Sequence, residues 1–300
     1  MRSPTVMQIK QTPEDFIVEE VFTHTPSGAG SYTWFTLKKR QLGTMDALHL
    51  LSKRWNRPFT AFNCAGLKDK QAMTTQTCSV KGNAGNLKEK NFEVIIIGQS
   101  DRPVSLGMHS GNKFTITVRD VAEVPKKKQL FLNYFGEQRF SVNNHLIGKA
   151  LVKGDYKTAC DLITSTGTPI KDANELRAMP KKLLRLYVHA YQSRLWNELL
   201  HEYELLGTIP DELPIVGFDS DSKDKLFQAQ LKKEGLKPRD FILKSMPELS
   251  EEGTIRKTHL TVTDLKIGKL KEQTVIIEFT LPSGAYATEV IRQLFSAHQE

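Results

Sequence analysis

Cysteine is scarce in this sequence: there are three among 300 residues, and no two of them lie within four positions of each other. An odd, widely spaced set argues against a disulfide framework and against a zinc knuckle, and it fits a reducing, cytoplasmic setting. The eight histidines are scattered and form no HExxH or HxxxH pair. The sequence therefore predicts no metal site.

Long apolar runs are also missing. No uninterrupted run approaches the roughly 20 residues that a membrane-spanning helix needs. The opening stretch, residues 1–16, contains no apolar segment of the kind found in a signal peptide. We therefore expect a protein with no membrane partner that stays in the cytoplasm.

Acidic residues are outnumbered: 34 Asp and Glu face 42 Lys and Arg, which gives a formal net charge of +8. Clustered cations release counterions from a phosphate backbone, so this excess is one mark of a nucleic-acid-binding protein. It is equally compatible with a basic protein that has no polyanionic partner. Apolar residues at 39% and charged residues at 25% are ordinary values for a globular chain with a sizeable core.

Strand-like patterns dominate both ends of the chain, and helical patterns dominate the middle. Alternation and β-branched or aromatic runs predict strands near 16–20, 32–37, 94–97, 114–118, 260–265 and 274–280. Helical spacing predicts helices over 44–55, 143–152, 156–164, 222–233 and 287–295, and a much longer one from Pro180 to a left-handed cap at Gly207. We expect Thr44 and Ser222 to cap their helices. This order predicts an α+β fold with a helical insertion.

Asp69 is the first candidate for chemistry. It lies between Lys68 and Lys70 in AGLKDKQAMTTQ, after a glycine and before a β-type run, which places it on a loop or strand end. The flanking cations would keep the carboxylate ionised as a nucleophile or base, and they could also hold phosphates. The alternative interpretation of the same residues is an ordinary charged turn.

Other segments contain residue types suited to a nucleic-acid site. NYFGEQRF at 133–140 combines aromatic faces with amides and an arginine, which suits an extruded base but also an aromatic-rich corner between elements. The lysines at 126–128 lie just upstream and are candidates for phosphate contacts. LPSGAYATEVIRQL at 281–294 places Arg292 in an apolar stretch. A partly buried guanidinium there would need a carboxylate such as Asp69; the alternative is an exposed arginine on an amphipathic helix.

Taken in order, these segments resemble the TruD family of pseudouridine synthases. IKQTPEDFIVE at 9–19 is similar to the opening motif of that family, and AGLKDKQAMTTQ at 65–76 to its catalytic motif. GNKFTITVR at 111–119, NYFGEQRF and LPSGAYATEVIRQL are similar to three further blocks. The resemblance spans nearly the whole chain and keeps the order of the family's motifs.

The resemblance implies a catalytic domain of pseudouridine-synthase fold, with a mixed or antiparallel sheet. This domain would comprise residues 1–152 and 253–300, and a mainly helical domain special to TruD proteins would be inserted at 153–252. The insertion looks shorter than in bacterial members of the family.

The resemblance also implies a reaction. A uridine of tRNA, usually position 13 in the D-arm, is isomerised to pseudouridine: the N-glycosidic bond breaks, the base rotates and a C–C bond forms. No cofactor and no metal are expected. Asp69 would be the nucleophile, with attack on the pyrimidine, attack on the ribose or initial action as a base all left open. Lys10, Asn133 and Phe135 would line the site, with Phe135 in place of the tyrosine that stacks in other pseudouridine synthases. Arg292 is the expected partner of Asp69.

Two other functions fit parts of the pattern. An RNA-binding module that folds or chaperones tRNA would keep the basic surface and the aromatics, but it would not need Asp69. A base-excising glycosylase also uses an aspartate and an extruded base, but it releases free base, whereas an isomerase conserves the mass of the RNA. An unspecialised basic α+β protein does not explain five motifs in order.

Overall fold

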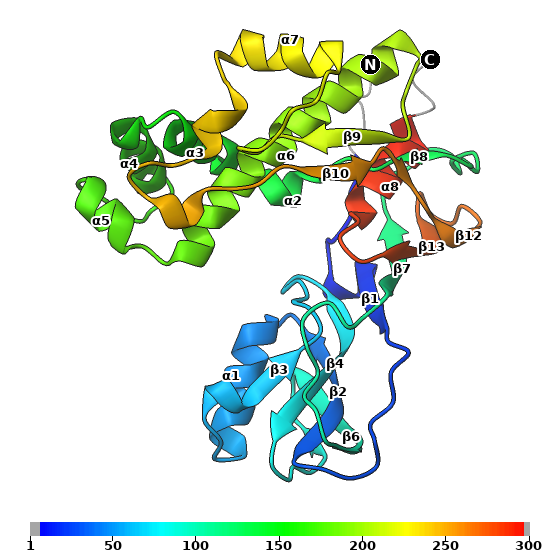
Figure 1. Cartoon of the computed structure of the whole chain (residues 1–300). Coiled ribbons are helices and arrows are strands. Elements are labelled where there is room, and N and C mark those ends of the chain that lie inside the picture. Colours follow the sequence, from blue (N-terminus) through cyan, green and yellow to red (C-terminus); the bar gives the residue numbers. More distant parts are fainter. Residues whose placement is uncertain (1–6, 297–300) are drawn as a thin grey trace. The chain divides into compact units, whose positions relative to one another are not determined.

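The computed structural model describes residues 7–296 and divides into two compact units (Figure 1). The first unit comprises the chain up to Gln129 together with Thr261–Ala287 and the part from Ile291 onward. The second comprises Leu130–Leu260 and Thr288–Val290. The predicted insertion, 153–252, lies within the second unit. Residues 1–6, part of the stretch expected to contain no signal peptide, lie outside the described residues.

A nine-stranded mixed sheet forms the frame of the first unit, in the order β12-β13-β7-β1-β4-β2-β6-β5, with β3 beside β4. Strands β1 and β4 are parallel, and the other pairings are antiparallel. The predicted α+β class is confirmed. The strands are β1 (Phe16–Val21), β2 (Tyr32–Arg40), β3 (Phe62–Cys64), β4 (Met73–Lys81), β5 (Leu87–Lys88), β6 (Phe92–Ser100), β7 (Gly111–Val118), β12 (Thr263–Ile267) and β13 (Val275–Pro282).

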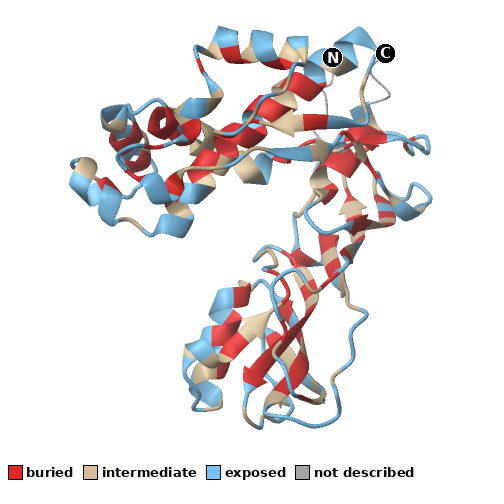
Figure 2. Cartoon of the chain, viewed as in Figure 1, coloured by how far each residue is buried: buried red, intermediate tan, exposed pale blue. Residues whose placement is uncertain are grey.

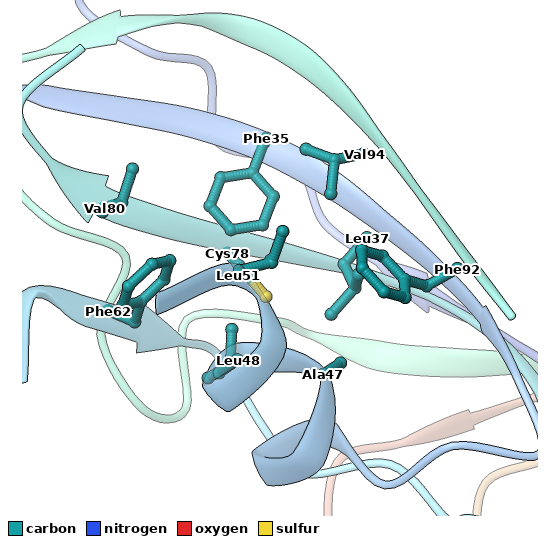
Figure 3. Close-up of a cluster of buried hydrophobic side chains, with 10 residues drawn as sticks. All are labelled: Phe35, Leu37, Ala47, Leu48, Leu51, Phe62, Cys78, Val80, Phe92 and Val94. Carbon is teal, nitrogen blue, oxygen red and sulfur yellow. The ribbon is translucent and has the colours of Figure 1, made fainter. Parts of the chain in front are cut away.

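Helix α1 (Thr44–Arg54) contributes to the core of this unit. Its residues Ala47, Leu48 and Leu51 share one helix face and pack against buried side chains of β2, β3, β4 and β6 (Figure 3). On β2 the strand period of two places Phe35 and Leu37 on this side, and it places Lys39 there as well. A lysine therefore occupies the next inward position after two core residues.

The second unit is built around the long helix α6 (Lys181–Leu206), and buried positions recur along it and along α3 (Asn144–Val152), as Figure 2 shows. Gly148 of α3 lets the two helices approach closely, because a Cβ there would lie 1.9 Å from the Tyr187 carbonyl oxygen. Helix α6 ends at Gly207, which has the predicted left-handed conformation with φ 67°. The other elements are α2 (Glu137–Phe140), α3 (Asn144–Val152), α4 (Tyr156–Ser165), α5 (Ala173–Ala178), α7 (Lys225–Glu234) and the two-stranded ribbons β8 (Phe131–Leu132) with β11 (His259–Leu260) and β9 (Glu212–Ile215) with β10 (Thr254–Lys257).

Three local predictions are wrong. Gly43, not Thr44, is the N-cap of α1, and the Thr44 hydroxyl instead donates to Oε1 of Gln76 at 2.8 Å. Helix α7 is capped by Asp224, whose carboxylate accepts from the Phe227 N–H, rather than by Ser222. Arg292, expected to be partly buried, is exposed on α8 (Ala287–Ser296). Its exposure agrees with the alternative, an arginine on the outer face of an amphipathic helix, while its pairing with Asp69 stays a prediction.

None of the helices within residues 7–296 combines the length and the apolar character needed to cross a membrane.

Candidate active site

The parallel pairing of β1 and β4 brings Lys10 and Asp69 together. Ile17 lies opposite Met73 in the sheet, so the segments that lead into the two strands arrive at the same edge. The Lys10 ammonium donates to Oδ2 of Asp69 at 2.8 Å. The two side chains are 20% and 29% exposed, so the ion pair is partly desolvated and still open to a substrate.

The PEDF turn fixes the segment that carries Lys10. Asp15 is buried and accepts from Nη2 of Arg119 at 2.7 Å, and Gln8 exchanges two backbone hydrogen bonds with the same arginine residue. Lys10 itself has a left-handed backbone with φ 63°, and its ammonium lies 4.1 Å from the centre of the Phe16 ring. Burial alone would raise the pKa of Asp15, but its hydrogen bonds to Arg119 and to the backbone of Thr12 outweigh burial and lower the pKa. This anchor is therefore ionised at neutral pH.

Side chains from three other elements hold the loop around Asp69. Lys39 of β2 donates to the carbonyl oxygens of Asp69 at 2.9 Å and of Lys68 at 3.3 Å. Thr44 of α1 accepts from the Lys68 N–H at 3.0 Å, and Gln76 of β4 donates to the Gly66 carbonyl at 3.0 Å. The Asp69 backbone is therefore tied to the sheet and to α1, which limits the motion of its carboxylate.

Lys68 does not have the role expected of it. Its ammonium donates to Oε1 of Glu20 at 2.6 Å, and these side chains are only 7% and 2% exposed. The second oxygen of Glu20 accepts from the Thr77 N–H at 2.8 Å. The prediction that Lys68 would hold phosphates is therefore wrong, because its ammonium is buried and paired with the Glu20 carboxylate. Lys70, on the other side of Asp69, is exposed.

The burial of Lys39 gives a testable pH effect on stability. Desolvation lowers the pKa of Lys39 from 10.5 to about 8, although the nearby Asp69 charge opposes this shift. Between these two pH values the unfolded chain keeps a proton that the folded chain has lost. The free energy of unfolding should therefore rise from pH 8 to pH 10.5, by up to about 3 kcal/mol from this group.

Urea unfolding at several pH values measures this effect. Lys39→Met should abolish the rise relative to the unmodified protein. Lys38→Met is the matched control, because Lys38 lies on the same strand with an exposed side chain and should leave the rise intact. Parallel stability curves for Lys39→Met and the unmodified protein would contradict the assignment.

Asn133 and Phe135 lie in the second unit, between β8 and α2. The Asn133 side chain donates to the Lys257 carbonyl at 2.9 Å and accepts from Nη2 of Arg256 at 2.6 Å. The backbone of Phe135 exchanges two hydrogen bonds with the side chain of Asn197, and the residue as a whole is 9% exposed. Four of the five predicted residues thus fall into two groups: Lys10 with Asp69 in the first unit, and Asn133 with Phe135 in the second. The fifth, Arg292, belongs to the first unit.

The comparisons with known proteins agree with the sequence motifs. The family model for tRNA pseudouridine synthase D (TruD) matches residues 2–175 and 207–294 of the chain, which include every predicted site residue. The chain belongs to the TruD family.

Relatives in several organisms extend this result. A probable tRNA pseudouridine synthase D of Nanoarchaeum equitans is 31% identical, with 96% of this chain and 98% of the relative covered. The tRNA pseudouridine synthase D of Aquifex aeolicus is 28% identical, with the same coverage. A crystal structure provisionally assigned as TruD from Methanosarcina mazei superposes with a TM-score of 0.76 at 23% identity, covering 98% of this chain and 94% of that one, which shows a shared fold. Both alignments with the curated relatives are longer than 300 residues, so these relatives contain residues without a counterpart here.

The TruD motifs flagged Lys10, Asp69, Asn133 and Phe135, but they did not flag the residues that hold them. The burial of Lys39 could have been found in the sequence, because strand alternation places it on the same inward side as Phe35 and Leu37. The pairs Glu20 with Lys68 and Asn133 with Arg256 join positions 48 and 123 residues apart. Contacts at such separations depend on the fold and leave no local pattern. Within residues 7–296, no cluster of three or more His, Cys, Asp or Glu side chains is arranged to hold a metal ion.

Proposed function

We propose that this chain isomerises a uridine of tRNA, position 13 of the D-arm, to pseudouridine, with Asp69 as the nucleophile. The ion pair of Lys10 and Asp69, held at 2.8 Å in a TruD-family chain, is the observation that supports this most directly. The ammonium favours the charged carboxylate, which is the nucleophilic form. The flipped uridine would reach it after leaving its stack at a cost of a few kcal/mol.

The isomerisation needs a nucleophile that first adds to the substrate and is then expelled from it, so that the enzyme is unchanged at the end. The N1–C1′ bond breaks, a C5–C1′ bond forms, C5 loses a proton and N1 gains one, so the atoms and electrons balance within the substrate. Because nothing is oxidised or reduced, we propose that no cofactor takes part. Asn133 and Phe135 are proposed to receive the base, and stacking on an aromatic ring contributes roughly 1–3 kcal/mol. Arg292 is proposed as a further cation near Asp69.

The same proposal covers the organisation of the chain. Residues 1–152 and 253–300 would form the catalytic domain and residues 153–252 the insertion, in a protein acting in the cytoplasm.

The choice of uridine is tested with a tRNA transcript and a second transcript in which cytidine replaces uridine at position 13. Pseudouridine should form in the first and not in the second. Equal pseudouridine content in both transcripts would contradict the assignment of position 13.

Binding of tRNA should depend steeply on salt. Lys126 and Lys127 are exposed and Lys128 is half-buried, so all three are candidates for phosphate contacts. Alanine at all three positions should reduce the slope of log Kd against log salt by about two to three. The matched control replaces Lys81, Lys88 and Lys90, three exposed lysines of the same unit, and removes the same charge. An equal reduction in both triple variants, measured by filter binding, would show only a general charge effect.

A further inference from the structure

Arg256 connects the two residues that the NYFGEQRF motif contributes to the proposed base site. It lies on β10, opposite Leu213 of β9, and no sequence motif marked it. Its Nε and Nη2 atoms donate to the Asn133 carbonyl oxygen at 3.2 and 2.9 Å, and Nη2 also donates to Oδ1 of Asn133 at 2.6 Å. One guanidinium therefore fixes both the backbone and the side-chain amide of Asn133.

The same guanidinium lies against Phe135. Its central carbon is 4.0 Å from the centre of the Phe135 ring and 5.3 Å from the Trp196 ring. Trp196 meets the Phe135 ring edge to face, with 5.6 Å between centroids and an interplanar angle of 88°. Asn197 holds the Phe135 backbone, while Trp196 and Arg256 pack against the ring, and Arg139 lies further away at 5.9 Å from its centre.

We propose that Arg256 is a positioning residue that holds Asn133 and the Phe135 ring in the orientation in which they receive the extruded uridine. The inference rests on the proposed role of Asn133 and Phe135. An arginine suits this position because its planar fork makes several hydrogen bonds in fixed directions while its flat face covers an aromatic ring, whereas a lysine ammonium is a point charge without that fork or that face. The amide of Asn133 has two donor hydrogens and two acceptor lone pairs, so its bonds to Arg256 and Lys257 use half of this capacity.

Arg256→Lys keeps the positive charge but removes the planar guanidinium, so it tests the positioning role apart from the charge. It should leave the Kd for tRNA within about twofold, because the positive charge remains. It should slow single-turnover pseudouridine formation about tenfold to a hundredfold, because small displacements at a reacting site are costly. Arg239→Lys is the matched control, since Arg239 is an exposed arginine of the same unit, and it should retain the rate. A wild-type rate for Arg256→Lys would overturn the proposal.

A double-mutant cycle shows whether Arg256 acts through Phe135. If it does, Arg256→Lys combined with Phe135→Leu should be no slower than the slower single variant. Multiplying losses would show an independent role and overturn the inference. If Phe135→Leu alone keeps the full rate, the proposed stacking role of Phe135 fails, and this inference fails with it. If Phe135→Leu is slow and Arg256→Lys is not, only the inference fails.

Chemical rescue distinguishes the loss of the guanidinium group from a defect in folding. The melting temperature of each variant is measured first, and rates are taken well below it. Added guanidinium chloride at low millimolar concentration should partly restore the rate of Arg256→Ala, because the ion refills the vacated position. The same concentration of sodium chloride should not restore it. A slow Arg256→Ala variant that is folded and insensitive to guanidinium would contradict the positioning role.

Discussion

Asp69→Asn is expected to make pseudouridine formation undetectable. The substitution keeps the size of the side chain and an oxygen that can accept from Lys10, but it removes the charge and the nucleophile. A loss of at least about 10⁴-fold corresponds to more than 5 kcal/mol of barrier lowering. The affinity for tRNA should hold or rise slightly, because a carboxylate repels phosphate.

The stability of this variant should change little. Asp69 is 29% exposed, and ion pairs with this degree of exposure contribute about 1 kcal/mol or less. Glu89→Gln is a suitable control, since it also removes a salt-bridged carboxylate, the partner of Arg54, and should retain the rate. Substantial isomerisation by purified Asp69→Asn, with contaminating enzyme excluded, would refute the role of Asp69.

Lys10→Met should have the second largest effect. It leaves the Asp69 carboxylate without the ammonium at 2.8 Å, and we expect the single-turnover rate at neutral pH to fall about 10²-fold, or ~2.7 kcal/mol. The melting temperature should change little, because the ion pair is partly exposed.

Lys70→Met is the matched control for this substitution. Lys70 adjoins Asp69 in sequence and is exposed, so its removal deletes the same charge without deleting the contact made by Lys10. Its single-turnover rate should stay close to that of the unmodified protein. Equal rates for Lys10→Met and Lys70→Met would show that the contact with Lys10 has no specific role.

The fold was largely predictable because periodic patterns encode it. Alternation gave β7, and helical spacing with a terminal glycine gave α6 and its left-handed end at Gly207. The helix starts were less predictable, because Thr44 is drawn to Gln76 and Lys68 by the tertiary fold instead of capping its helix. The Thr44 hydroxyl could bond either to the start of its own helix or to residues elsewhere in the fold, and the local sequence does not distinguish these two outcomes.

The site was predictable only in part. The motifs identified Lys10 and Asp69, and the parallel pairing of β1 and β4 explains why these two side chains meet. Arg292 was expected to be partly buried because its sequence neighbours are apolar, yet one polar position on an amphipathic helix faces outward. The supporting contacts of Lys39 and Arg256 depend on strand register and on residues far apart in the chain, which no local pattern records.

The most direct test of the account is to incubate the purified chain with unmodified tRNA transcripts in buffer containing EDTA. Carbodiimide-dependent reverse-transcription stops then map pseudouridine, and free uracil is measured in the same reaction. We expect a new stop at position 13, RNA of unchanged mass and no released uracil. Released uracil with an abasic site, or no stop in any transcript despite tight binding, would contradict it.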